Sequence, residues 1–195
     1  MKTKILYTMT FLRTSSQKLL LSAALLLSLG ACEDALVENP KFMVVENFFN
    51  TAGEVEAAVN AIYTPLRSNN YTVYETTLEC QADYAYGRGS WTPLHEHKGL
   101  NDANISRVAG LWNAFYLSIR NANLVIANAP KGTSISQADI AKNVAEAKFL
   151  RAFNYFQLVR NWAGVPLRTE NSMTETDLKK STPEEVYALI VADLL

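Results

Sequence analysis

The sequence predicts an all-α protein, and three observations support this fold class. Apolar residues recur at intervals of three and four along several long stretches, which is the period of one helix face. Serine or threonine stands before several of these stretches, in patterns that cap the first turn of a helix. The composition, 49% hydrophobic with 8 glycines and 6 prolines in 195 residues, is that of a globular chain.

The stretch 145–167 is the segment around which the other predicted helices are organised. Its apolar residues predict one helix face, and small residues within that face let a second helix approach closely. Gly164 is expected to end the helix in the left-handed conformation, and Pro166 prevents its resumption. The predicted apolar face consists of Ala145, Phe149, Ala152, Phe153, Phe156 and Val159, and the residues expected largely on the other faces are Lys148, Arg151, Asn154, Gln157 and Arg160.

Residues 102–129 predict the partner of this helix, capped near Asp102 or Asn104. A short linker follows, and Ser136 with Asp139 then caps the organising helix. Two long amphipathic helices joined by a short linker predict an antiparallel hairpin. The apolar face of the partner helix is expected to comprise Val108, Leu111, Trp112, Phe115, Ile119, Ala122 and Ile126.

Three further helices are predicted around this hairpin. Thr51 and Glu54 form a capping box at the start of a helix over about 51–66, and 73–83 predicts a weaker helix because it is rich in β-branched residues. Thr182 and Glu185 form a second capping box before a last helix. That helix carries an apolar face made of Val186, Leu189, Ile190 and Leu194, with no partner in view, which favours a fragment or an assembly.

Residues 1–31 predict a secretory signal rather than part of the fold. Four basic residues and no acidic residue occur there, and the apolar run of 11 residues at 19–29 is too short for a membrane-spanning helix. Leu29-Gly-Ala-Cys32 resembles the lipobox of bacterial lipoproteins, which predicts acylation of Cys32 and a tether over 32–47. Several acyl chains would anchor the chain at a membrane. The alternative is an ordinary signal peptide with an incidental cysteine.

Charge and cysteine content exclude several classes of protein. The first 31 residues carry 4 of the 18 basic residues and none of the 19 acidic ones, so residues 32–195 have a net charge of −5. Without a basic run, nucleic-acid binding is not expected. If Cys32 is acylated, Cys80 is unpaired, and we expect it to be a small buried apolar side chain rather than a metal ligand.

The aperiodic stretch 84–101 is the candidate ligand-binding region. Sugar rings stack on aromatic side chains while nearby polar groups bind their hydroxyls, and Trp91 lies here among such groups. The alternative role for Trp91 is to pin the loop to the core. The candidate glycan-binding residues are Trp91, Tyr84, Tyr86, Arg88, Asn101 and Asp102.

Catalytic and metal chemistry find less support in this stretch. His95 and His97 have no evident third ligand, so we expect no metal site, and no cofactor is expected. A glycoside hydrolase would need two opposed carboxylates. The nearby acidic residues are Asp83, Glu96 and Asp102, and nothing marks them as paired.

Several runs, in this order, resemble the SusD/RagB family of nutrient-binding outer-membrane lipoproteins. The runs are Ser118-Ile-Arg-Asn-Ala-Asn123, Ala127-Asn-Ala-Pro130, the helix 145–160, Gly164-Val-Pro-Leu167, Ser181-Thr-Pro-Glu-Glu-Val-Tyr187 and Ile190-Val-Ala-Asp-Leu194. The resemblance covers essentially all of the chain after the signal. One departure is Ala163, where many members of the family carry glycine.

The resemblance implies tetratricopeptide-like antiparallel helix pairs with long irregular loops, with 48–195 forming the N-terminal part of a longer SusD-like domain. It also implies a non-enzymatic cell-surface lipoprotein of the outer membrane. Such a protein binds glycan or another nutrient and passes it to a TonB-dependent transporter of the SusC type. The alternative function is a helical-repeat interaction scaffold without a small-molecule ligand.

Overall fold

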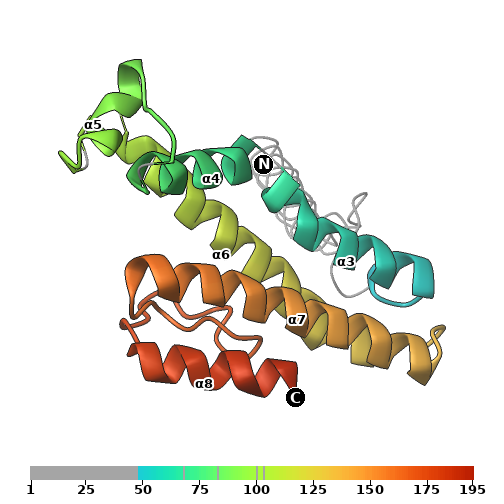
Figure 1. Cartoon of the computed structure of the whole chain (residues 1–195). Helices are drawn as coiled ribbons and strands as arrows, with labels where there is room; N and C mark the ends of the chain where they lie inside the picture. Colours follow the sequence, from blue (N-terminus) through green and yellow to red (C-terminus); the bar gives the residue numbers. More distant parts are fainter. Residues whose placement is uncertain (1–47, 68, 83, 100, 103) are drawn as a thin grey trace, which may run out of the picture. The chain divides into compact units, whose positions relative to one another are not determined.

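The computed structural model describes residues 48–67, 69–82, 84–99, 101–102 and 104–195 (Figure 1). Within these residues the chain is helical, and an isolated bridge between Thr51 and Ser134 is the β-type pairing present. The all-α prediction is therefore confirmed. The elements are α3 (Ala52–Arg67), α4 (Asn69–Gln81), η2 (Gly89–Trp91), α5 (Thr92–His95), α6 (Ile105–Asn128), η3 (Ala129–Lys131), α7 (Gln137–Trp162) and α8 (Pro183–Leu194).

Predictions for residues 1–47 lie outside the described residues. They are the signal peptide, the acylation of Cys32 and the tether. Among the described helices, none combines the length and the apolar character that a membrane crossing requires. Cys80 is 3% exposed and is not in a disulfide, as the sequence predicts.

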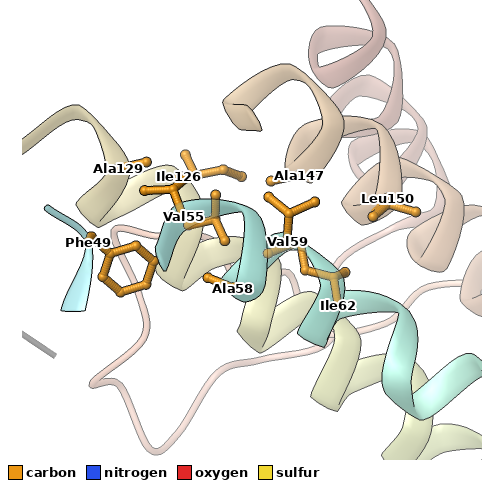
Figure 2. Packing of buried hydrophobic residues seen from close by; sticks show 11 residues of the cluster. Phe49, Val55, Ala58, Val59, Ile62, Ile126, Ala129, Ala147 and Leu150 are labelled. Carbon is orange, nitrogen blue, oxygen red and sulfur yellow. The ribbon is translucent and has the colours of Figure 1, made fainter. Parts of the chain in front are cut away.

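Helices α6 and α7 form the predicted antiparallel hairpin, and α3 packs against both of them (Figure 1). Figure 2 shows the core at this junction, where Val55 and Val59 of α3 lie beside Ile126 of α6 and Ala147 of α7. Ala147 is fully buried, so its small side chain permits the close approach of α3. An isolated amphipathic helix is only marginally stable in water, and the burial of its apolar face in this core stabilises it.

A second core cluster lies where α4, α6, α7 and α8 meet. Phe115 of α6 contacts Tyr74 of α4 edge to face, with ring centroids 5.8 Å apart. Tyr155 and Leu158 of α7 are fully buried in the same cluster, and Val186 of α8 closes it. Helix α8 therefore has a partner, contrary to the sequence-based expectation, because one side of α7 is free to receive it. Leu194, predicted on the buried face of α8, is 55% exposed.

The buried face of α7 is not the one that its apolar pattern predicts. Phe149 is 55% exposed and Phe156 is 38% exposed, while Phe153 is half-buried and belongs to neither core cluster. Arg151 and Asn154, predicted on the other faces, are buried. Phe153 is therefore not a core contact between the two long helices. The free energy of unfolding should depend less on it than the 3–5 kcal/mol that deletion of a buried Phe typically costs.

Hydrogen bonds explain why polar residues of α7 can be buried. Asn154 Nδ2 donates to Ser118 Oγ at 3.0 Å and to the Leu150 carbonyl at 2.7 Å. The Arg151 guanidinium donates to Asn123 Oδ1 at 2.8 Å and forms an ion pair with Asp193. Buried polar groups with such partners avoid the cost of desolvation without compensation. Because α7 has α3 and α6 on one side and α8 on another, its buried surface is wider than one apolar stripe.

Capping residues set where α3, α7 and α8 begin, as predicted. Thr51 N donates to Glu54 Oε2 at 2.8 Å and Glu54 N donates to Thr51 Oγ1 at 3.3 Å, which completes the first capping box. The hydrogen bond from Thr51 is the main reason why the pKa of Glu54 lies below its ordinary value. Thr182 and Glu185 form the second capping box, and the Asp139 amide donates to Ser136 Oγ at 3.1 Å.

Two helix boundaries differ from the predictions. Helix α4 begins at Asn69, four residues before the predicted start, and Thr76 and Thr77 donate their hydroxyls to carbonyls one turn earlier in the helix. At the end of α7, Ala163 rather than Gly164 takes the positive φ, at 58°. Gly164 is needed for a different reason. A Cβ at this position would lie 2.0 Å from the Ser181 carbonyl oxygen, so the chain can pass here only with glycine.

Candidate functional site

The predicted ligand-binding loop connects α4 to α6 and is more ordered than the sequence suggests. It contains the 3-10 turn η2 and the four-residue helix α5, which the absence of periodicity in the sequence does not reveal. Leu94 of α5 is 2% exposed and fixes the loop to the helical body. Gly87 lets the loop close on itself, because a Cβ there would lie 2.5 Å from the Trp91 carbonyl oxygen.

Trp91 is half-buried, and one face of its ring is covered. The guanidinium carbon of Arg107, on α6, lies 3.9 Å from the ring centroid. Arg107 also donates to Ser90 O at 3.1 Å and to Ser90 Oγ at 2.6 Å. Trp91 therefore helps to hold the loop on α6, as the alternative interpretation expects, and at most its second ring face can meet a ligand. The sequence offered no signal for Arg107, because its partner lies sixteen residues earlier in the chain.

Tyr84 and Tyr86 are the exposed aromatic residues of this loop. Tyr84 is 85% exposed and Tyr86 is 69% exposed. Tyr86 contacts the His95 ring at a centroid distance of 4.5 Å, which orients its side chain while leaving most of its surface free. Arg88, two residues after Tyr86 in the chain, is also exposed. Sugars bind to exposed aromatic faces together with polar groups. In this loop the two tyrosines meet that requirement better than Trp91, because they are more exposed.

Asn101 and Asp102 are exposed where the loop reaches α6. The sequence predicts a cap at Asp102 or Asn104. Asn104 directly precedes α6, but its side chain makes no capping hydrogen bond to that helix. Instead its Oδ1 accepts from Asn101 N at 2.9 Å, and its Nδ2 donates to the Gly99 carbonyl at 3.3 Å. Asn104 is 1% exposed, so these bonds fix the end of the loop to the body of the protein.

A cavity of about 310 Å³ lies beneath the loop, between α4, α5, α6 and the end of α7. Arg107 and Leu94 line it, together with Gln81, Asn161 and Trp162. The six predicted glycan-binding residues are not among its described lining. The structure thus has two separate features. One is the pair of exposed tyrosines on the loop, and the other is the cavity, whose lining residue Arg107 also contacts Ser90 and Trp91 of the loop.

The histidines and carboxylates of the loop are not gathered into one site. Glu96 pairs with Lys98 at 2.9 Å, Asp102 is exposed, and Asp83 lies outside the described residues. His97 is exposed with a φ of 51°. Across the described part of the chain, no group of three or more His, Cys, Asp or Glu residues is placed to hold a metal ion.

Hydrogen bonds of polar side chains join α3 to the two long helices. Asn121 Nδ2 donates to the Ala61 carbonyl at 2.9 Å, and Glu146 Oε1 accepts from the Tyr63 hydroxyl at 2.8 Å. Burial of that hydroxyl and its bond to Glu146 raise the pKa of Tyr63. These residues join α3 to α6 and α7 and are structural.

Comparison with known proteins identifies the family. A family model of SusD-like proteins, described as "Starch-binding associating with outer membrane", matches residues 37–195. SusD-like protein P2 of Formosa agariphila is 32% identical over 180 residues, which cover 87% of this chain and 35% of that protein. The chain spans about a third of the length of the curated relatives it matches.

Solved structures agree on the fold. A SusD homolog from Bacteroides thetaiotaomicron matches with a TM-score of 0.57 and 26% identity, over 76% of this chain and 30% of that one. A protein crystallised with a xylogluco-oligosaccharide matches with a TM-score of 0.58 and 24% identity, over 71% of this chain and 28% of that one. The helix pairs are therefore of the tetratricopeptide-like kind, and the order of sequence runs, the helical hairpin and the family match together show that the chain belongs to the SusD-like family.

Proposed function

We propose that this chain is a lipid-anchored protein on the exterior face of the outer membrane, where it binds glycan and passes it to a TonB-dependent transporter of the SusC type. The observation that carries the proposal is the family match over 37–195, whose description joins starch binding to the outer membrane. The exposed tyrosines of the loop are consistent with it. The proposal includes no catalytic step, since glycan capture needs only aromatic faces and placed hydrogen-bonding groups.

The loop provides the first surface for the sugar. Tyr86, held at its edge by His95, presents a ring face on which a pyranose can stack. Tyr84 and Arg88 are exposed nearby in the chain. Asn101 and Asp102, in the loop just before α6, offer an amide and a carboxylate to sugar hydroxyls. Trp91 supports this surface, because Arg107 covers one of its faces.

Calorimetric titration of the purified protein with a xylogluco-oligosaccharide tests the binding role. Replacing Tyr86 by alanine should weaken binding about tenfold, since loss of one aromatic platform removes roughly 0.5–1.5 kcal/mol beyond its area burial. Tyr187→Ala is the matched control, because Tyr187 is a tyrosine on α8, 42% exposed and distant in sequence from the loop.

The outcomes separate the candidate functions. Loss of affinity in Tyr86→Ala but not in Tyr187→Ala, with unchanged melting temperatures, supports the loop site. If the wild type, Tyr86→Ala and Tyr187→Ala bind with equal affinity, the glycan does not bind at Tyr86. Absence of binding to any of a panel of glycans favours the interaction scaffold. For the transporter, co-purification of the anchored protein with a TonB-dependent outer-membrane protein is the expected result, and purification without one contradicts that part of the proposal.

A further inference from the structure

A groove of about 770 Å³ lies between α6 and the segment that joins α7 to α8. Its α6 wall carries the aromatic side chains of Trp112 and Tyr116, and its opposite wall carries polar residues of 168–177, including Arg168 and Asp177. Arg120 of α6 also lines it. The volume lies in the range of small-molecule sites, and the mixture of apolar surface with a few polar groups is typical of them.

Hydrogen bonds hold the two walls in fixed positions. The Tyr116 hydroxyl donates to the Pro166 carbonyl at 2.8 Å, and Asn123 Nδ2 donates to the Arg168 carbonyl at 3.0 Å. The Tyr155 hydroxyl accepts from Arg168 N at 2.6 Å and donates to Arg168 O at 2.8 Å. Burial of these hydroxyls raises the pKa of Tyr116 and of Tyr155. A wall held in this way needs little reordering to receive a ligand.

The aromatic wall is fixed as well. The Trp112 ring lies 4.9 Å from the Tyr116 ring and 5.5 Å, edge to face, from the Trp162 ring. Trp112 and Tyr116 are both half-buried, so part of each ring is left to line the groove. The contacts of Trp112 with Trp162 and Tyr116 bear out its role in packing, but they do not use its whole surface.

The charges of the groove differ in sign from those of the chain. Two arginines, Arg120 and Arg168, are among its lining residues, against one acidic residue, Asp177. Residues 32–195 as a whole have a net charge of −5, from 14 basic and 19 acidic residues. Arg168 Nη1 donates to the backbone carbonyl of Glu175. A carbonyl carries no net charge, so this bond does not neutralise the positive charge of Arg168. Within the described part of the chain, Arg120 is exposed and forms no ion pair or hydrogen bond.

From this arrangement we infer that the groove binds an acidic oligosaccharide, one that carries carboxylate or sulfate groups. The inference rests on the proposed function of glycan binding and names the substrate class at a second site. A sugar ring would lie on the Trp112 and Tyr116 wall, and Arg120 would pair with its anionic group. An apolar occupant fits less well, because it would bury the guanidinium of Arg120 without a partner.

The test is calorimetric titration of the whole purified protein with three probes: an oligogalacturonate, a chondroitin sulfate oligosaccharide and a neutral xylogluco-oligosaccharide. Arg120→Gln removes the charge and keeps a polar, though shorter, side chain. Arg160→Gln is the matched control, because Arg160 is an exposed arginine on α7 that stacks on Phe156 at 5.0 Å and does not line the groove. Thermal unfolding of each variant checks that the fold is unchanged.

We expect binding of at least one acidic probe, a loss of about tenfold or more in Arg120→Gln and no loss in Arg160→Gln, since hydrogen bonds to charged groups are among the stronger ones. Higher salt should weaken this binding. The carboxylate and sulfate probes show which anion is preferred.

Other results overturn the inference in distinguishable ways. Binding of an acidic probe that Arg120→Gln leaves unchanged excludes the groove, and binding of the neutral probe alone excludes the acidic substrate class, while both leave the proposed function standing. Absence of binding to all three probes contradicts the inference, and the panel of glycans that tests the proposed function then decides whether the protein binds glycan at all.

Discussion

Ala163 shows at the scale of one residue how the end of α7 places a strained backbone conformation on a residue other than glycine. It ends α7 with a φ of 58° and a ψ of −127°, a conformation that side chains with a Cβ adopt at a cost of about 1–3 kcal/mol. Many members of the family carry glycine here, as the resemblance implies. At the neighbouring position 164, glycine is required because a Cβ would clash with the Ser181 carbonyl oxygen, and not because of a positive φ.

Replacing Ala163 by glycine should therefore stabilise the protein. The relief of backbone strain exceeds the roughly 0.5–1 kcal/mol that glycine loses in conformational entropy, which leaves a gain of about 1 kcal/mol. Urea unfolding at constant m-value measures this change as a higher midpoint. Gly164→Ala is the opposite control and should cost roughly 1–3 kcal/mol, because its Cβ would overlap a backbone oxygen. A lower midpoint for Ala163→Gly would show that the positive φ carries no strain.

At the scale of elements, Arg151 joins four parts of the chain. Its side chain is 3% exposed, and it bonds Asn123 of α6, Glu170 of the segment 163–182 and Asp193 of α8. The bonds from Nε and Nη2 to the two oxygens of Asp193 measure 2.7 Å and 2.6 Å, a bidentate pair. Burial opposes the charge of Arg151, but its hydrogen bonds to Asp193 and Glu170 hold its pKa above the ordinary value.

Glu170 makes this junction sensitive to acid. Partial burial would raise its pKa, but the hydrogen bond from Arg151 holds that pKa below the ordinary value of 4.5. A carboxyl whose pKa is lower in the folded state stabilises the protein above the unfolded value. That contribution disappears as the pH falls through the folded value. Glu170→Gln should therefore be less stable than the wild type at pH 7, and the difference should begin to shrink near pH 4.5 and disappear as the pH falls through the lower pKa of the folded state.

Denaturant midpoints across the pH range measure this effect. Glu175→Gln is the matched control, because Glu175 is an exposed carboxylate of the same segment, and its curve should follow the wild type. If the gap between Glu170→Gln and the wild type stays constant down to pH 3, the ion pair with Arg151 does not set the pH dependence.

At the scale of the whole molecule, the described helices form one part of a chain that begins with a predicted export signal. Residues 48–195 supply the helical body, and the anchor is proposed to be the acylated Cys32. Each buried CH₂ of an acyl chain contributes about 0.8 kcal/mol, so several chains suffice for stable attachment to a membrane. This would hold the binding surfaces beside an outer-membrane transporter without a spanning helix.

Cys32→Ala should move the protein from the membrane fraction to the soluble fraction of cells that express it. The loss of the acylated residue removes the anchor and leaves the helical body unchanged. Cell fractionation followed by immunoblotting measures the distribution, and Cys80→Ala, which changes the buried free cysteine, is the control that should stay with the membrane. If Cys32→Ala stays membrane-bound to the same extent, the lipobox interpretation is wrong.

The sequence alone was sufficient for those features that depend on neighbours in the chain. Capping residues such as Thr51, Ser136 and Thr182 act on amides within one turn, so their pattern predicts where helices begin. The 3.6-residue period in the same way predicts the α6–α7 hairpin. It also located the loop that carries Tyr84 and Tyr86, because a break in the period is visible without a structure.

Only the tertiary structure decided which surfaces are buried and which groups meet. Phe149 is exposed, against the apolar pattern. Arg151 is buried, also against that pattern, because α8 packs beside α7 and its Asp193 neutralises the guanidinium. The covering of Trp91 by Arg107 and the pairing of the α6 wall with the Arg168 wall likewise join segments distant along the chain. Such contacts depend on how whole helices pack against one another. The periodicity of the sequence shows that a helix face is apolar, but it does not specify which segment will pack against that face.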